Sequence, residues 1–299
     1  MPFKCRDAWH RQMRAYLEAR RNEVARTTLA DYRGWLEDAG CLVGFQSPTR
    51  LPLAQMQRIE AETFGCSSTK LVHCAIVRNF LLWCGNVEAK RWKIISKQRP
   101  KVDGVFLNEP QVRTCRDAAR SLGTEAELMF SLGVDNGMRL IDMKRLTLEN
   151  AHQLLSSGVS MILSKGRGGG KLRPQALNDV TRNALLKYLE QRKRLVERYG
   201  ERRELLIHEF RKAVQPMSSR YMRKRLTAVS GKARVRFKPH DLRRTFGHRH
   251  WKAGTPLETI AALMGHESIN QTFKCYIGII GDDLVSAQRN LCPSDPTHA

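Results

Sequence analysis

The sequence lacks any long hydrophobic run, because its longest apolar stretches, such as residues 80–84, are far shorter than the roughly 20 residues of a membrane-spanning helix. Its first residues, Met1-Pro-Phe-Lys-Cys, also lack the apolar segment of a secretory signal peptide. These two absences argue against an integral membrane protein and against a secreted one. We therefore expect a cytoplasmic protein that has no membrane partner.

The sequence also lacks closely spaced pairs of cysteines. The eight cysteines lie at positions 5, 41, 66, 74, 84, 115, 275 and 292, and no two of them form a Cys-x-x-Cys motif. This spacing argues against a zinc ribbon. In a reducing cytoplasm we expect these side chains to be small, mostly buried hydrophobic groups rather than members of structural disulfides.

Acidic residues are scarce relative to basic ones, with 29 Asp and Glu against 52 Lys and Arg, which gives a net charge of +23. Residues 1–99 carry 17 basic against 9 acidic residues (+8), and residues 100–299 carry 35 against 20 (+15), so the excess is not confined to one tail. A basic surface gains affinity for nucleic acid through counterion release. Nucleic acid is therefore the expected partner, and charge alone leaves a ribosome-like basic protein as the alternative.

With 299 residues and a hydrophobic fraction of 41%, the chain is long enough for two domains with separate cores. We predict a helical domain at residues 1–95, because apolar residues recur there at helical spacing and Ser, Thr or Pro precede each such run. Four of its aromatic residues are interpreted as core rather than as platforms for stacked bases: Tyr32, Trp35, Phe80 and Trp83.

The polar, Pro- and Gly-containing stretch at residues 96–107 is predicted to be a linker. A second domain at residues 108–299 follows. Its helices are expected after cap signals at Asn108, Thr124, Asp179, Ser218 and Thr255.

Two β-prone runs, residues 159–164 and 172–177, flank a basic glycine-rich tip and predict a β-hairpin. The predicted fold class is therefore mainly α with one small β-sheet, in which a helical N-terminal domain precedes a C-terminal α+β domain.

The most informative stretch runs from His240 to Tyr276, within the most basic part of the chain. His240 and Arg243 are three residues apart in a helix expected after Pro239, so they share a face of that helix. His266 ends a short predicted helix, and Tyr276 lies ten residues further on. This order of helices and turns can bring the four side chains around one point.

These residue types suit attack on a phosphodiester without a metal ion. In-line attack builds negative charge on the non-bridging oxygens, which positioned cations stabilise, and the forked guanidinium of arginine fits this role. A tyrosine hydroxyl becomes nucleophilic once a base takes its proton, and the leaving 5′ oxygen needs a proton from a lysine or histidine. Such a site needs at least two arginines, so one is still missing from this stretch.

The missing groups are predicted upstream. Gly137 is expected to end one helix and Arg139 to begin the next, at a helix N-terminus that favours anions. Asp142, one turn later, can pair with Arg139 and fix its rotamer. Lys165 ends the first strand of the predicted hairpin, where a flexible tip lets it approach a groove of DNA.

These residues resemble the tyrosine recombinases, the family of the phage integrases and the Xer proteins. The family pattern is Gly-x-Arg with an acid three residues after the arginine, then a hairpin lysine, His-x-x-Arg, Gly-His and a tyrosine. In this chain the pattern reads, in order, Gly137-Met138-Arg139 with Asp142, Lys165, His240 with Arg243, Gly265-His266, and Tyr276. The resemblance covers the second domain, whereas the first resembles the family's DNA-binding core-binding domain in size and position only.

The resemblance implies a site-specific DNA recombinase or integrase that cleaves and rejoins duplex DNA through a 3′-phosphotyrosine, without a metal ion, ATP or another cofactor. It assigns the nucleophile to Tyr276, proton removal to His240 and protonation of the leaving oxygen to Lys165. Binding of the scissile phosphate falls to the remaining members of the pattern, Arg139, Arg243 and His266.

The resemblance also implies an assembly. Two domains would clamp double-stranded DNA that carries a specific recombination site, and a homotetramer would act on two such sites. The DNA would belong to the nucleoid, a phage or a mobile element, and accessory proteins are not specified. Residues 277–291 are the expected segment for exchange between neighbouring subunits.

Two departures from the family pattern leave alternatives open. The hairpin tip is longer and richer in glycine than usual, so the general acid is either Lys165 or Lys171. Tyr276 follows His266 by ten residues, where nine is the commoner spacing. Further DNA contacts are predicted for the basic residues near this site, Lys171, Arg173 and Arg244.

Two other functions share these features. A type IB topoisomerase-like enzyme uses the same chemistry but relaxes DNA as a monomer, and a non-catalytic DNA-binding protein can have the same fold. The complete residue set argues against the non-catalytic alternative. A metal site at His248 and His250 is not expected, because residues two apart point to different helix faces and no acid or thiol lies close in sequence.

Overall fold

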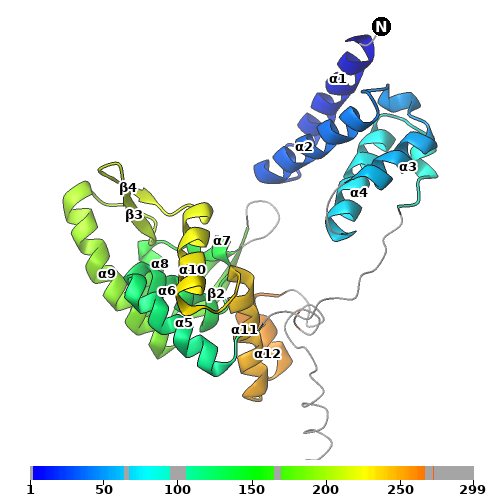
Figure 1. The fold of residues 1–299 in the computed structure, drawn as a ribbon. Coiled ribbons are helices and arrows are strands. Elements are labelled where there is room, and N and C mark those ends of the chain that lie inside the picture. The colour runs from blue at the N-terminus through cyan, green and yellow to red at the C-terminus, as the bar shows by residue number, and fades with distance from the viewer. Residues whose placement is uncertain (1–2, 64–66, 95–105, 165–169, 267–271, 273–299) are drawn as a thin grey trace, which may run out of the picture. The chain divides into compact units, whose positions relative to one another are not determined.

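The computed structural model describes residues 3–63, 67–94, 106–164, 170–266 and 272 (Figure 1). The described residues up to 94 form one compact unit, and those from 106 onwards form another. Residues 96–105 of the predicted linker lie outside the described residues. None of the described helices is both long enough and apolar enough to cross a membrane.

The first unit is helical. Its elements are α1 (Phe3–Ala19), α2 (Arg26–Leu42), α3 (Leu53–Glu62) and α4 (Ser67–Trp83), with two short 3-10 turns, η1 (Pro48–Arg50) and η2 (Glu88–Lys90). The helices predicted in this part of the chain are confirmed. The buried face of α2 includes Leu36, Ala39 and Gly40.

Aromatic side chains fill the core of the first unit. Trp9 and Tyr16 both contact Phe80 edge to face, at ring-centroid distances of 5.2 and 5.5 Å, and all three are buried. Burial of three such rings is the main source of stability here, at roughly 1.5–3 kcal/mol for each large apolar side chain. The predicted core position of Phe80 is confirmed, but that of Trp83 is wrong, because 45% of Trp83 is exposed.

The second unit is built around one buried helix, α6 (Thr124–Val134), in which every residue from Ala126 to Val134 is buried. Helices α5 (Glu109–Leu122), α9 (Asp179–Tyr199), α10 (Ser219–Ala233) and α11 (Pro239–Lys252) pack against it. The remaining helices of this unit are α7 (Leu140–Arg145), α8 (Leu148–Ser157) and α12 (Leu257–Met264).

The predicted β-hairpin is confirmed. Strand β1 (Val159–Ser164) pairs antiparallel with β2 (Lys171–Ala176), in a register that sets Ser164 opposite Lys171. The prediction of one small sheet is wrong in number, because β3 (Ile207–Phe210) and β4 (Ala213–Pro216) form a second hairpin. Its tip residues have φ of 51° and 55° but are Arg211 and Lys212, so the usual Gly or Asn signal of such a turn is missing.

A buried ionic network ties α11 to the central helix of the second unit. Asp135 follows α6 and accepts two hydrogen bonds from Arg116 of α5, at 2.8 and 2.9 Å. Arg249 of α11 donates to the same carboxylate at 3.0 Å. Removing one partner from such a buried group typically costs roughly 3–5 kcal/mol. The network therefore fixes the helix that carries part of the candidate site.

The helix caps were predicted with mixed success. Asn108 caps α5 through a capping box, as predicted. The capping boxes predicted at Thr124 and Thr255 do not form, because the residues directly before α6 and α12 are Gly123 and Pro256, which have no side-chain acceptor.

Two of the described cysteines behave as the sequence predicts. Cys74 and Cys115 are buried hydrophobic neighbours in the cores of the first and second units. Burial raises the pKa of each thiol to about 11, so both remain protonated near neutral pH. Cys41, in contrast, is exposed.

Candidate active site

Arg243 of α11 is the most deeply buried member of the predicted site, with 0% of its surface exposed. A cation is buried only where its donors find acceptors. Its Nη1 donates to the carbonyl of Gly137, and its Nη2 donates to the carbonyl of Met264. The same Nη2 lies 2.9 Å from Nε2 of His266. Arg243 thus joins α11, the turn before α7 and the end of α12 at one point.

Arg139 approaches the same point from the other side. It is the N-cap residue of α7, with an extended backbone. Its Nη2 lies 3.5 Å from the carbonyl oxygen of Gly265, and its Nη1 lies 3.4 Å from the Ser164 hydroxyl and 3.7 Å from Asp142. These contacts are long, and 22% of the side chain is exposed, so Arg139 is the arginine that an anion can reach.

His266 completes the cluster as a neutral ring. Arginine has no acceptor, so the contact with Arg243 requires that Nε2 of His266 carry the lone pair and Nδ1 the proton. That Nδ1–H then donates to the hydroxyl of the buried Thr272, at 2.7 Å. Burial, followed by the charges of Arg243 and Arg139, lowers the pKa of His266 to about 3. Sequence reasoning missed Thr272, because nothing local marks its buried hydroxyl.

His240 lies in the first turn of α11 and is exposed. Crowding of its ring by the surrounding protein lowers its pKa, and the charges of Arg244, Arg243 and Arg139 act in the same direction. His240 therefore lies close enough to these arginines for their charge to disfavour its protonated form, and its neutral form is favoured. A neutral imidazole can accept a proton, which suits the predicted role as a base.

Two glycines let the backbone segments of the site come together. Gly137 has φ of +60°, and a Cβ there would lie 2.5 Å from the ring of Phe246. Gly265 has φ of +61°, and a Cβ there would lie 2.7 Å from Cδ of Arg173. Both positions combine a left-handed backbone with a close neighbour, so neither tolerates a larger residue without movement.

Arg173 is placed differently from the sequence-based prediction. It was expected to contact DNA, but only 4% of it is exposed, on the buried face of the β1–β2 hairpin. Its Nη2 donates to Asp142 at 3.2 Å, and its Nη1 donates to the carbonyl of Leu263 at 3.1 Å. The Ser164 hydroxyl also donates to Asp142, at 3.1 Å. The DNA contact predicted for Arg173 is thus corrected to a buried ion pair.

Strand pairing explains the buried position of Arg173. Arg173 is the cross-strand partner of Ile162, and directly opposite residues of an antiparallel pair point to the same face. Because Ile162 is buried, Arg173 must be buried too. An alternation rule that turns polar residues outward gives the opposite answer.

Two predicted catalytic residues, Lys165 and Tyr276, lie outside the described residues. The alternative lysine, Lys171, opens β2 and is partly exposed. Its register partner is Ser164, the residue directly before Lys165. Lys171 therefore lies at the end of the hairpin that carries Ser164.

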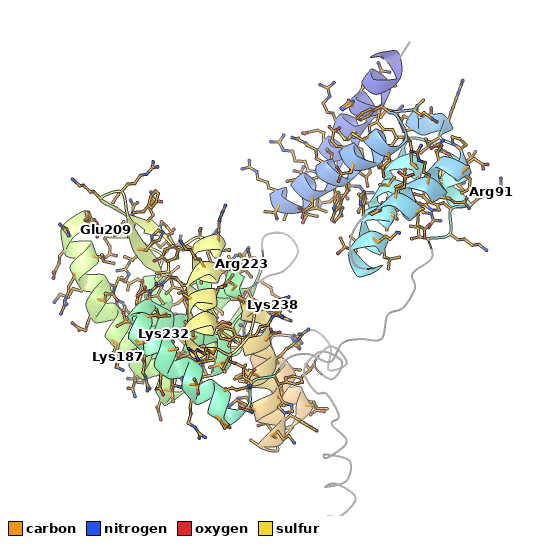
Figure 2. The ribbon with its side chains drawn as sticks, viewed as in Figure 1. Arg91, Lys187, Glu209, Arg223, Lys232 and Lys238 are labelled. Atoms are coloured by element: carbon orange, nitrogen blue, oxygen red, sulfur yellow. The ribbon has the colours of Figure 1, made fainter. Side chains whose placement is uncertain are left out.

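A basic surface adjoins the site. Arg223 and Lys232 of α10 and Lys238 at the start of α11 project from the second unit and are exposed (Figure 2). Arg244 is half-buried and pairs with Asp241 at 3.2 Å, so part of its charge is already matched. These exposed cations can attract a polyanion to the second unit.

Residues 91–279 match the phage integrase family. The match covers more than half of the chain, and the protein belongs to this family. The resemblance to the tyrosine recombinases is thereby confirmed.

Two curated relatives show how far the similarity extends. The tyrosine recombinase XerC of Chlorobaculum parvum is 31% identical over 175 residues, which cover 57% of this chain and 47% of that protein. The tyrosine recombinase XerA of Pyrococcus furiosus is 22% identical over 229 residues, which cover 77% of this chain and 76% of that protein. The alignment thus spans about half of the length of the Chlorobaculum relative.

Solved structures with the same fold include two recombinases bound to DNA. The Tn1549 transposon integrase in complex with a circular intermediate DNA has a TM-score of 0.70 at 15% identity, and the alignment covers 96% of this chain and 99% of that chain. XerH bound to palindromic difH substrate has a TM-score of 0.68 at 18% identity, with coverage of 96% and 87%. At these identities the comparison shows a shared fold, and it confirms the predicted fold class.

Proposed function

We propose that this protein is a site-specific DNA recombinase, which cleaves and rejoins duplex DNA through a 3′-phosphotyrosine on Tyr276. The observation that carries the proposal is the convergence of Arg139, Arg243 and His266 on the turn at residues 264–266. Two guanidinium groups and an imidazole from three separate helical segments meet there. Such a cluster can stabilise the charge that develops on the non-bridging oxygens of a phosphodiester under attack.

The residues have distinct roles in this proposal. Arg139 binds the phosphate first, because it is partly exposed and its present contacts are long. Arg243 now donates to main-chain carbonyls, so it reaches the phosphate only when the turn at residues 264–266 moves. His240, whose pKa is lowered, accepts the proton of Tyr276.

In this scheme the energy of the cleaved phosphodiester bond is conserved in the phosphotyrosine bond. The tyrosine oxygen forms a bond to phosphorus as the bond to the 5′ oxygen breaks, and Lys165 supplies the proton for that oxygen. Attack of a 5′ hydroxyl on the phosphotyrosine reverses these steps, so rejoining requires no ATP.

The wider setting follows from the same proposal. The partner is double-stranded DNA with a specific site, and four copies of the chain act on two such sites, because each duplex is cut at two positions. The protein acts in the cytoplasm on nucleoid, phage or mobile-element DNA. The XerH and Tn1549 integrase structures, which were solved with bound DNA, support the choice of partner.

The test of the nucleophile uses nicked duplexes that carry the target site. Wild-type protein is expected to form a covalent adduct that resists SDS, and Tyr276→Phe is expected to form none. Tyr199→Phe is the matched control, because the Tyr199 hydroxyl contacts Glu209 at the surface, away from the cluster. An adduct with Tyr276→Phe would show that another residue is the nucleophile. Relaxation of supercoils by monomers without strand exchange would identify a topoisomerase-like enzyme instead.

The general acid is tested with a 5′-bridging phosphorothiolate at the cleavage site. A thiolate leaves without protonation, so loss of the general acid slows cleavage of the ordinary ester but not of the thio-ester. We expect this rescue for Lys165→Ala, and a similar defect on both substrates for Lys171→Ala. The opposite result would assign the role to Lys171.

A further inference from the structure

The β1–β2 hairpin has an inverted distribution of polar and apolar side chains. Its buried face carries Ser160, Ser164, Arg173 and Gln175. Its outer face is apolar, with Val159, Met161, Leu163 and Leu172 exposed. Burial of a guanidinium is costly unless a carboxylate and further acceptors offset its desolvation. The contacts of Arg173 therefore indicate a specific role on that inner face.

The contacts of Arg173 link three parts of the candidate site. Its Nη2 donates to Asp142 at 3.2 Å, and Asp142 is fully buried. Its Nη1 donates to the carbonyl of Leu263 at 3.1 Å, in the last turn of α12, three residues before His266. Its Cδ also packs where a Cβ on Gly265 would lie.

Asp142 lies between two cations at unequal distances. Arg173 is 3.2 Å away and hydrogen-bonded, whereas Arg139 is 3.7 Å away, beyond an ordinary hydrogen bond. A buried carboxylate attracts the nearest available cation strongly. If Arg173 were absent, the same attraction would draw Arg139 towards Asp142 and away from an incoming phosphate.

We propose that Arg173 is a positioning residue for cleavage, a role that rests on the proposed function. It neutralises Asp142, so that the Arg139 guanidinium stays directed at the scissile phosphate, and it holds the end of α12 that precedes His266. Arg173 itself does not touch the DNA. The family pattern pairs the acid at Asp142 only with Arg139. In this chain Arg173 provides a second positive charge for Asp142. Arg139 is therefore not drawn to Asp142 and stays available for catalysis.

The first test compares three variants on a nicked duplex. Arg173→Met keeps the length of the side chain but leaves Asp142 charged, and we expect cleavage to fall on the order of 10²-fold, as for loss of one positioned donor. Affinity for DNA is expected to change less than about twofold, because Arg173 is buried. Asp142→Asn in the Arg173→Met background removes the negative charge that attracts Arg139 and is expected to recover about tenfold of the lost rate. If Arg173→Met cleaves like wild type, the proposal is wrong.

The second test separates positioning of Arg139 from general disruption. A methylphosphonate at the scissile position has one neutral non-bridging substituent, so cleavage depends less on cations. The defect of Arg173→Met should shrink to about threefold or less on this substrate, in parallel with that of Arg139→Ala. An equal loss on both substrates would mean that Arg173 only maintains the fold. If the single variant fails to fold, Arg173→Lys is tested instead. It keeps the positive charge beside Asp142, so it should cleave much faster than Arg139→Ala, and an equal loss would contradict neutralisation of Asp142 by Arg173.

A readout without catalysis keeps the two proposals separate. In guanidinium NMR spectra of the DNA-free protein, the Arg139 resonance should show slowed rotation in Arg173→Met, because Arg139 then pairs with Asp142. It should return to wild-type behaviour when Asp142→Asn is added. This result together with an inactive wild type would overturn the proposed function but would still show that Arg173 keeps Arg139 from pairing with Asp142. An unchanged Arg139 resonance in Arg173→Met would overturn the positioning role alone.

Discussion

The two units of this protein have cores of different chemistry. In the described part of the first unit, no Asp, Glu, Lys or Arg is buried, and the core consists of residues such as Trp9, Tyr16 and Phe80. In the second unit the described buried residues also include seven charged side chains, namely Glu127, Asp135, Asp142, Arg173, Arg192, Asp241 and Arg243. Among the described residues, buried charges are therefore confined to the unit that holds the candidate site.

This difference shows what each core contributes. Apolar packing stabilises a fold but places little constraint on the chemistry of its surroundings. Buried ion pairs add little net stability, because desolvation offsets their attraction, yet they fix the direction of each guanidinium. The second unit therefore gains orientation rather than stability from Asp142 and Arg173, and the following predictions test that distinction.

The largest expected effect is that of Arg243→Ala. Two buried carbonyls and the ring of His266 lose their donor, so we expect the second unit to lose roughly 2–5 kcal/mol of unfolding free energy. Cleavage should also fall by at least about 10³-fold. Denaturant unfolding and the adduct assay measure the two losses. Arg139→Ala is the control, because its long contacts predict a similar loss of cleavage with little loss of stability, and equal destabilisation by both variants would contradict this.

The next largest effect tests the apolar core of the first unit. Phe80→Ala removes a fully buried ring that contacts Trp9 and Tyr16, which should cost roughly 3–5 kcal/mol. The loss should be confined to unfolding of the first unit, detected by tryptophan fluorescence of Trp9. Trp83→Ala, at an exposed position, serves as the matched control and should cost less. A large shift in unfolding of the second unit would show that the two cores are not independent.

A smaller effect concerns the pH dependence of the second unit. The folded pKa of His266 is about 3, below its value of about 6.5 in an unfolded chain, so as pH falls the unfolded state binds the proton first. Stability should therefore decrease as pH falls from about 6.5 towards 3. The lowered pKa values of His240 and His250 act in the same direction. Urea unfolding at pH 7.5 and pH 5 should show a smaller change for His266→Asn than for wild type.

The smallest effect concerns the surface of the first unit. Arg14 of α1, Arg21 in the turn after it, and Arg26 and Arg33 of α2 line one groove. If these arginines contact DNA phosphates, Arg26→Gln should reduce the slope of log affinity against log salt by about 0.9. Arg58→Gln is the control, because Arg58 lies on α3, outside the groove, and pairs with Glu62 of the same helix. Equal slopes for wild type and Arg26→Gln would remove this groove from the DNA-binding surface.

Local sequence signals predicted the elements well. The helices of the first unit, the β1–β2 hairpin and the N-cap position of Arg139 all follow from periodicity, caps and turns. The hairpin of β3 and β4 was missed, because its turn uses Arg211 and Lys212 where glycine or asparagine is usual. Local rules fail there because the surrounding packing stabilises a backbone that the two residues do not prefer.

The sequence predicted which residues form the candidate site but not how their side chains are arranged. The motif spacing selected Arg139, Arg243 and His266, and the structure brings these three together. The predicted roles of Tyr276 and Lys165 remain predictions, since both lie outside the described residues. Arg173 was assigned to the DNA surface, because its position depends on the partner strand and not on its neighbours in sequence.

By itself, the sequence determined the family, the basic character and the identity of the candidate groups, because these depend on residue types and spacings along the chain. Only the tertiary structure decided which charges face one another. Asp142 meets Arg173 from a strand 31 residues away, and Arg243 meets the carbonyl of Gly137 from a helix 106 residues away. Electrostatic interactions fall off with distance in space, not with separation in sequence, so the orientation of each arginine is a property of the folded chain.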